Sequence, residues 1–447
     1  MLDLAKKALS FAVKAGADEA EAFVLDSRVM RIRVYRQEVE ELASSETRGV
    51  GIRVFNKKSV GYAYTSELSE AGLSGAAAAA IANASVTAAD EYAGLPLPAA
   101  VYPDLDLFSE KLGQTPLQEK IRLAKKVEQA ALDRDKRISQ VEGASYVEGD
   151  AHVAIASSLG LFGEHQETSC YAFLQAIAEK DGQMQTGTSF TTGREPGSLA
   201  GAGCGNEAAD RALTLLGGSQ CQTMSCPVVM DPFVTAGVAG VIGSALTGEV
   251  VQKKRSMFAG LEGSEVASKF FRLVDDGIHP EGLASAPFDG EGVPTQETVL
   301  IEDGILQGYL YDTYTGRKDG RASTGNGNRH SFYSLPHVSA NNLRVPPGDK
   351  SREEIIASVD MGFYVMDVTG IHSGANPVTG DFSVGASGRI IRNGELSEPV
   401  REVTIAGNLK AMLLAIAAVG NDNRWVPFGG SIHAPTLLLS EMTISGK

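Results

Sequence analysis

The sequence has few cysteines for its length. Only four occur among 447 residues, Cys170, Cys204, Cys221 and Cys226, and no two of them form a Cys-x-x-Cys pair. Neither a disulfide framework nor a zinc knuckle is therefore indicated. We expect free, buried thiols in a protein that resides in a reducing compartment.

Long apolar stretches and an excess of basic charge are also missing. No run approaches the roughly 18 apolar residues that a membrane-spanning helix needs. Asp3, Lys6 and Lys7 interrupt the apolar residues of the N-terminal segment, so we do not expect it to be a secretory signal. The 40 basic and 55 acidic side chains give a net charge of −15, which repels phosphate backbones and favours solubility. We expect a cytoplasmic protein with neither a nucleic-acid nor a membrane partner.

The common local motifs of catalysis are absent as well. None of the seven histidines precedes a glutamate, so a His-Glu-x-x-His zinc helix does not occur. His330 and His337 are too far apart in sequence for one helical face, although metal ligands gathered from distant segments, such as His330, His337 and His372, remain an alternative. No Gly-x-Ser-x-Gly elbow is present, and Gly201–Gly205 has the wrong spacing for a dinucleotide loop.

What the sequence does contain predicts an α+β fold of two domains. The N-terminal domain, residues 1–224, should pack helices on a mostly antiparallel sheet. The C-terminal domain, residues 225–447, is rich in glycine and short strands and should form a β-rich, barrel-like sheet with a few helices. Hydrophobic periodicity predicts helices over 2–13, 71–84, 116–134, 207–216, 234–252 and 408–419, and strands over 30–35, 49–55, 59–64, 138–147, 151–157 and 167–179. Thr115 should cap the 116–134 helix, with Gln118 completing a capping box, after an extended connection over residues 92–106.

Dense glycine and polar patterning marks the second half of the chain. The stretches are Phe288–Thr295, Ser323–Asn328 and His372–Gly388. Asn, Asp and Gly tolerate left-handed dihedral angles, so one interpretation is a series of turns. The alternative is a groove whose exposed backbone groups receive an extended peptide as an added strand.

The same stretches resemble the TldD/PmbA (TldE) family, and Gly388–Glu395 adds a strand-turn typical of it. The likeness covers essentially the whole chain. It implies a two-domain subunit that pairs into a dimer, usually one TldD with one TldE. The complex is expected to be a cytoplasmic metalloprotease of unfolded or extended peptides, and the family's older label, modulator of DNA gyrase, does not require contact with DNA.

Within this resemblance, TldD carries His-Glu-x-x-x-His on the first helix of its C-terminal domain. The matching positions here are Gly248, Glu249 and Lys253. Glycine offers no ligand, and a lysine ammonium repels a dication. TldD also has a cysteine near its C-terminus, whereas the last cysteine here is Cys226. The chain therefore resembles TldE more than TldD, with no catalytic residue and no metal of its own, and zinc is expected on a TldD partner.

The sequence thus predicts a non-catalytic subunit that completes a heterodimer with a TldD-type subunit, and it leaves a homodimer of the isolated chain open. Asn376, Gly380, Asp381 and Ser383 are the residues expected to hold an extended peptide substrate. Two alternatives remain, a stand-alone metallopeptidase with scattered ligands and a non-enzymatic regulatory protein such as a gyrase modulator.

Overall fold

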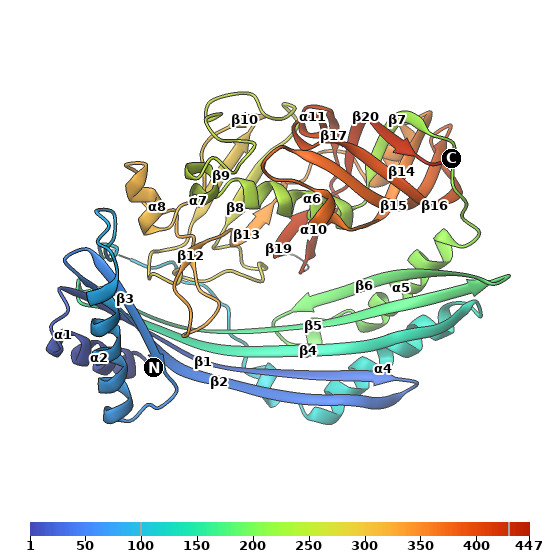
Figure 1. Cartoon of the computed structure of the whole chain (residues 1–447). Helices are drawn as coiled ribbons and strands as arrows, with labels where there is room; N and C mark the ends of the chain where they lie inside the picture. Colours follow the sequence, from blue (N-terminus) through green and yellow to red (C-terminus); the bar gives the residue numbers. More distant parts are fainter. Residues whose placement is uncertain (99–100, 428–429) are drawn as a thin grey trace.

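The computed structural model describes residues 1–98, 101–427 and 430–447. It has two layers, a long curved N-terminal sheet and a β-rich C-terminal part that lies along one side of it (Figure 1). Residues 99 and 100 of the connection predicted over 92–106 lie outside the described residues. The described part of that connection contains no helix or strand before α3 (Glu110–Gln114).

The N-terminal sheet is antiparallel throughout, in the order β3-β2-β1-β4-β5-β6. Its strands are β1 (Glu19–Tyr35), β2 (Glu38–Asn56), β3 (Ser59–Thr65), β4 (Ile138–Ser157), β5 (Phe162–Lys180) and β6 (Gln183–Gly193). Several are far longer than the sequence predicted. The strands expected over 138–147 and 151–157 are one continuous strand, β4, and β6 was not predicted.

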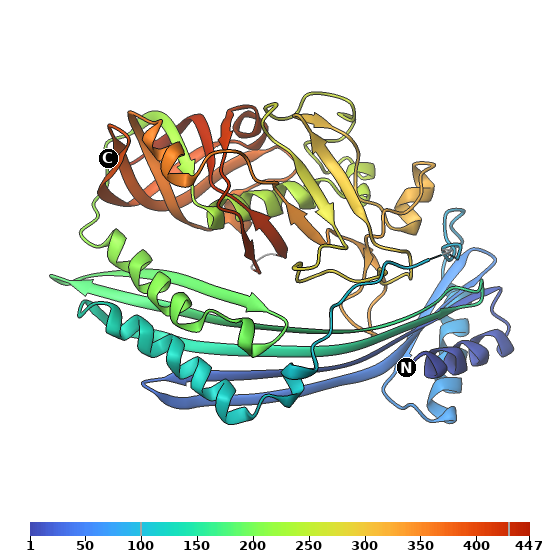
Figure 2. The same cartoon turned by 180° about the vertical axis from the view of Figure 1, so that it is seen from behind.

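Helices cover the two halves of this sheet separately (Figure 2). The helices α1 (Leu2–Lys14) and α2 (Glu70–Val86) form an alanine-rich core with β1 to β4. The helices α4 (Leu117–Arg134) and α5 (Gly201–Leu215) pack on the other half. A Cβ atom at Gly205 would lie 2.2 Å from the carbonyl oxygen of Val127. The glycines that resembled a nucleotide loop therefore allow α5 to approach α4 closely.

The C-terminal part contains a closed five-stranded barrel, which confirms the predicted fold class. Its order is β16-β15-β14-β7-β20, and pairing of β16 with β20 closes it. The strands are β7 (Met224–Met230), β14 (Met361–Thr369), β15 (Asp381–Arg392), β16 (Glu395–Asn408) and β20 (Leu437–Ser445), and β17 (Ile416–Val419) extends the sheet from β20. The domain division at residues 224 and 225 falls at the start of β7 and stays a prediction.

A second sheet stands beside the barrel, in the order β10-β9-β8-β13-β19-β18. Its strands are β8 (Leu273–Asp276), β9 (Glu297–Glu302), β10 (Ile305–Leu306), β13 (Asn342–Arg344), β18 (Arg424–Val426) and β19 (Ser431–Ala434), and β11 (Gly327–Asn328) pairs with β12 (His337–Val338). The remaining helices are α6 (Pro232–Ala245), α7 (Gly248–Gln252), α8 (Thr313–Lys318), α9 (Arg352–Ala357), α10 (Ile371–Gly374) and α11 (Leu409–Leu414), with a 3-10 turn at Pro196–Ser198.

Three local predictions were wrong because other hydrogen bonds compete for the same groups. The Thr115 hydroxyl donates to the Lys111 carbonyl, so it ends α3, and Pro116 precedes α4 without a side-chain cap. The helix predicted over 408–419 ends at Leu414, because the residues after it pair with β20. The helix predicted over 234–252 is interrupted at Leu246 and Thr247, as described below.

A buried set of alternating charges joins the two layers. Arg53 Nη2 lies 2.8 Å from Glu21 Oε2, and its Nη1 lies 3.0 Å from Glu291 Oε1. Arg329 pairs with the second oxygen of Glu21. All four side chains are nearly inaccessible to solvent. Since Glu21 and Arg53 belong to the N-terminal sheet while Glu291 and Arg329 come from loops of the C-terminal part, this interlayer charge network fixes one layer on the other.

We predict that Glu21→Ala destabilises the protein by about 3–5 kcal/mol, because it leaves Arg329 buried without its partner. Glu46→Ala is the matched control: it breaks the exposed Arg28–Glu46 pair of the same sheet and should cost at most about 1 kcal/mol. Urea-induced unfolding measures both. Equal losses of unfolding free energy in the two variants would show that the network does not stabilise the contact between the layers.

Candidate functional site

The first position of the degenerate zinc motif, Gly248, is closed to a larger side chain. Thr247 is extended and bridges to Leu310, and the Gly248 N–H donates to the Leu310 carbonyl at 2.7 Å. This contact separates α6 from α7. A Cβ atom at Gly248 would lie 2.6 Å from the ring of Tyr311, which is itself buried and whose hydroxyl donates to Asp319.

The other two motif positions pair with each other. Lys253 Nζ lies 2.5 Å from Glu249 Oε1, one helical turn away, and both side chains are about half exposed. An ion pair this exposed contributes little to stability. It nevertheless places a cation against the carboxylate that would serve as the general base in the catalytic motif.

The structure brings His330 and His337 together, although their sequence separation argued against a shared helical face. The β11–β12 pairing places the two rings 4.7 Å apart, centroid to centroid. Burial and the neighbouring His330 lower the pKa of His337, while the carboxylates of Glu249 and Asp312 act in the opposite direction. His372 is on α10 and lines a different region. Across residues 1–98, 101–427 and 430–447, no group of three His, Cys, Asp or Glu side chains could hold a metal ion.

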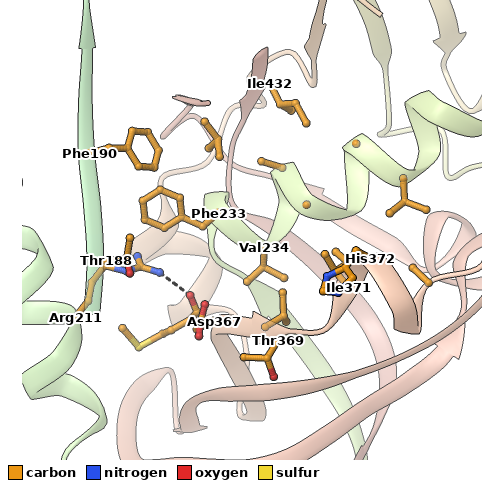
Figure 3. Close-up of a pocket in the computed structure, with 18 of the residues that line it drawn as sticks. Thr188, Phe190, Arg211, Phe233, Val234, Asp367, Thr369, Ile371, His372 and Ile432 are labelled. Carbon is orange, nitrogen blue, oxygen red and sulfur yellow. Dashed lines mark hydrogen bonds between the residues drawn. The ribbon is translucent and has the colours of Figure 1, made fainter. Parts of the chain in front are cut away.

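A cleft between the two layers has a volume of about 720 Å³. Thr186 to Thr188 and Phe190 of β6 form one wall, together with Arg211 of α5. The opposite wall comes from α6, from the end of β14 and from α10, including Asp367, Thr369, Ile371 and His372 (Figure 3). Most of the remaining lining is apolar.

Arg211 organises one end of the cleft. Its Nη1 contacts both oxygens of Asp231 at 3.1–3.2 Å, and its Nη2 donates to the Met366 carbonyl at 2.5 Å. Asp231 also caps α6 by accepting from the Phe233 N–H and receives the Tyr364 hydroxyl. The Arg211 guanidinium stacks over the Phe233 ring at 4.3 Å. Both terminal nitrogens of the guanidinium are therefore engaged within the protein.

The four residues predicted to hold a peptide lie together at the start of β15. The Asn376 side chain accepts from the N–H groups of Val378 and Thr379, which makes an Asx turn. Gly380 has a φ of +83° within it. Asp381 accepts from the Thr379 hydroxyl, and Ser383 is exposed on β15. These side chains mainly shape their own turn, whose Ala375 and Pro377 line the cleft, and their role in peptide binding stays a prediction.

Sequence reasoning missed Asp367 and Arg211. Asp367 follows the apolar run Phe363–Met366 in a strand, and an acid inside such a run is a signal that could have been noticed. Arg211 carried no signal, because its partners Asp231 and Met366 are distant in sequence.

The fold places a long helix-covered sheet beside a closed barrel, with the cleft between them. Models of the PmbA/TldA metallopeptidase family match residues 20–84 (domain 1), 110–216 (central domain) and 223–446 (C-terminal domain). The chain belongs to this family.

Known relatives are similar over nearly their whole length. Metalloprotease PmbA of Escherichia coli O157:H7 is 32% identical over 446 residues, which cover 96% of this chain and 93% of the relative. The crystal structure of TldE from Thermococcus kodakarensis superposes with a TM-score of 0.91 at 25% identity, covering 99% of each chain. A structure from Thermotoga maritima, named as a proposed modulator of a DNA gyrase, gives a TM-score of 0.92 at 28% identity, again covering 99% of each chain.

Among the described residues, no helix combines the length and apolar character needed to cross a bilayer. Three of the four cysteines are buried and Cys221 is half-buried, and all four are free thiols.

We predict that the pH titration of His337 depends on the carboxylate of Glu249. The pKa of His337 lies below its ordinary value of about 6.5, so protonation favours the unfolded chain. The stability that neutral His337 contributes is therefore complete above about pH 6.5 and is lost as the pH falls through the lowered pKa. Glu249→Gln should lower this pKa further, and His330→Gln should raise it. Ring-proton NMR titration measures both, and an unchanged midpoint in Glu249→Gln would show that the carboxylate does not act on His337.

Proposed function

We propose that this chain is the non-catalytic, TldE-type subunit of a TldD/TldE metalloprotease, acting in the cytoplasm on unfolded or extended peptides. The remodelled motif carries the proposal. The position of one expected ligand, Gly248, is occupied by the Tyr311 ring, and the other, Lys253, neutralises Glu249.

The partner would supply the zinc and the general base. This chain would complete the dimer and restrict entry to extended chains, since an active site enclosed by a second subunit excludes folded proteins and bulk water. The similarity to a structure named TldE supports this assignment.

The test combines metal analysis with reconstitution. The purified chain should carry far less than one zinc per molecule and hydrolyse no unfolded peptide alone. Mixed with its cognate TldD-type subunit, it should raise hydrolysis well above that of the partner alone. Stoichiometric zinc on the isolated chain would support the stand-alone peptidase instead, and partner activity unaffected by this chain would favour a regulatory role.

We predict that restoring both histidines, Gly248→His with Lys253→His, does not create a zinc site. An imidazole at position 248 must displace the buried Tyr311 ring, which costs on the order of 1–3 kcal/mol of overpacking. Lys253→His alone is the matched control, because position 253 is exposed. Competition with a chromophoric chelator measures zinc affinity, and tight, stoichiometric binding by the double variant alone would show that the scaffold keeps the catalytic geometry.

A further inference from the structure

The interdomain cleft continues as a groove along β6. A second hollow of about 260 Å³ is lined by Gln185 at the start of β6, by Thr369, and by residues of β15 and β16. Thr369 also lines the main cleft. The two hollows therefore share a wall residue, and together they follow β6 from Gln185 to Phe190.

The wall formed by β6 offers backbone groups. In the described part of the chain, β6 is the last strand of its sheet and pairs only with β5. Gly187 lines the cleft although its Cβ direction points into α5, 2.3 Å from the Ala208 carbonyl oxygen. The cleft therefore meets Gly187 through its main-chain atoms. An edge strand, which has a strand partner on one side alone, is the usual acceptor for an added peptide strand.

The facing wall contains an acid, Asp367, that forms no salt bridge in the described part of the chain. The register of β14 against β15 shifts between Val365 and Asp367, and this bulge leaves Met366 and Asp367 both on the outer face of the barrel while Val368 packs inward. Burial raises the pKa of Asp367. The backbone N–H of Val368 and the charge of Arg211 act on this carboxylate in the opposite direction. Within the residues that the structure describes, the carboxylate forms no salt bridge, because Arg211 Nη1 contacts Asp231 and Nη2 donates to the Met366 carbonyl.

The rest of the lining suits apolar side chains. Phe233 and Val234 of α6, Ile371 of α10 and Ile432 of β19 line the same cleft as the acid. A carboxylate without a salt bridge in a cleft of mostly apolar lining is complementary to a cation carried on an apolar segment. The net charge of −15 favours the same sign of ligand and disfavours a nucleic acid.

We propose that this cleft binds an extended peptide as an added strand along β6, with a lysine or arginine side chain of the peptide on Asp367 and apolar neighbours on the α6–α10 wall. This assignment rests on the proposed function, and it names basic–apolar peptides as the class this subunit selects. The catalytic partner is not needed for this binding.

The test measures binding of a fluorescein-labelled nonapeptide, with a central lysine flanked by valine and leucine, to the full-length chain alone. Replacing the central lysine by glutamate should weaken binding by about tenfold or more, as expected for loss of one charge-assisted contact. Asp367→Asn should weaken binding of the lysine peptide by a similar factor and remove most of the discrimination. Asp181→Asn, the same charge change in the exposed β5–β6 turn, should leave both unchanged.

A second probe tests the strand pairing separately. The lysine peptide with alternate N-methylated residues keeps its side chains but loses main-chain donors, and it should bind about tenfold more weakly if it pairs with β6. Thermal unfolding of Asp367→Asn should match the parent protein, because the carboxylate forms no salt bridge in the described structure and the amide oxygen of asparagine can still accept the Val368 N–H.

Equal affinity of the parent protein for the lysine and glutamate peptides, or an Asp367→Asn variant that still discriminates between them, would overturn the inference. Equal affinity of the N-methylated peptide would overturn the β6 pairing. These outcomes are distinct from failure of the proposed function. If the partner subunit cleaves peptides equally well without this chain, the proposed subunit role fails, while peptide binding at Asp367 stands. If cleavage requires this chain but is the same with the Asp367→Asn variant, the subunit role stands and the role of Asp367 fails.

Discussion

The interlayer charge network is the contact on which the arrangement of this protein depends. Glu21 accepts from both Arg53 and Arg329, so one carboxylate of the N-terminal sheet holds a loop of the C-terminal part. Glu291, from a loop of the C-terminal part, forms an ion pair with Arg53 and also accepts a hydrogen bond from the N–H of Thr313, the first residue of α8. Buried ion pairs of this kind add little net stability over apolar packing, but they form only when the charged groups are in one relative arrangement. The network therefore fixes the position of one layer relative to the other.

That position has consequences at both ends of the molecule. Thr313 follows the segment that contains Leu310 and Tyr311, and this segment is the one that interrupts the helix before α7 and fills the space beside Gly248. On the other side, the Arg424–Glu207 pair joins β18 to α5 next to the cleft. The interlayer charge network and the Arg424–Glu207 pair therefore both connect the two layers that form the cleft, and they fix its width without a ligand.

Much of the architecture could be predicted from the sequence, because α1, α2, the β2–β3 hairpin and the α+β class all rest on local periodicity. The errors have tertiary causes. Residues 416–419 have a helical composition yet pair with β20, and Thr247 leaves the helix to bridge to Leu310. At the site, the glycine-rich motifs identified the family, but the Phe288–Thr295 motif turned out to support the interlayer network, with Asp289 accepting three backbone N–H groups. The contacts of Arg211 span 20 residues to Asp231 and 155 residues to Met366, so they could not be read from any local pattern.

Under the proposed function, a metallopeptidase fold has lost catalysis and kept recognition. Glycine in place of a ligand histidine would leave a cavity, and the buried Tyr311 ring occupies the space beside Gly248. Glu249 would then have no metal-bound water to activate, and Lys253 compensates its charge. None of these changes touches β6, the β14 bulge or Asp367. Because the two regions are built from different elements, substitutions at the motif positions would leave the groove undisturbed, as the proposed role of this chain in holding a peptide requires.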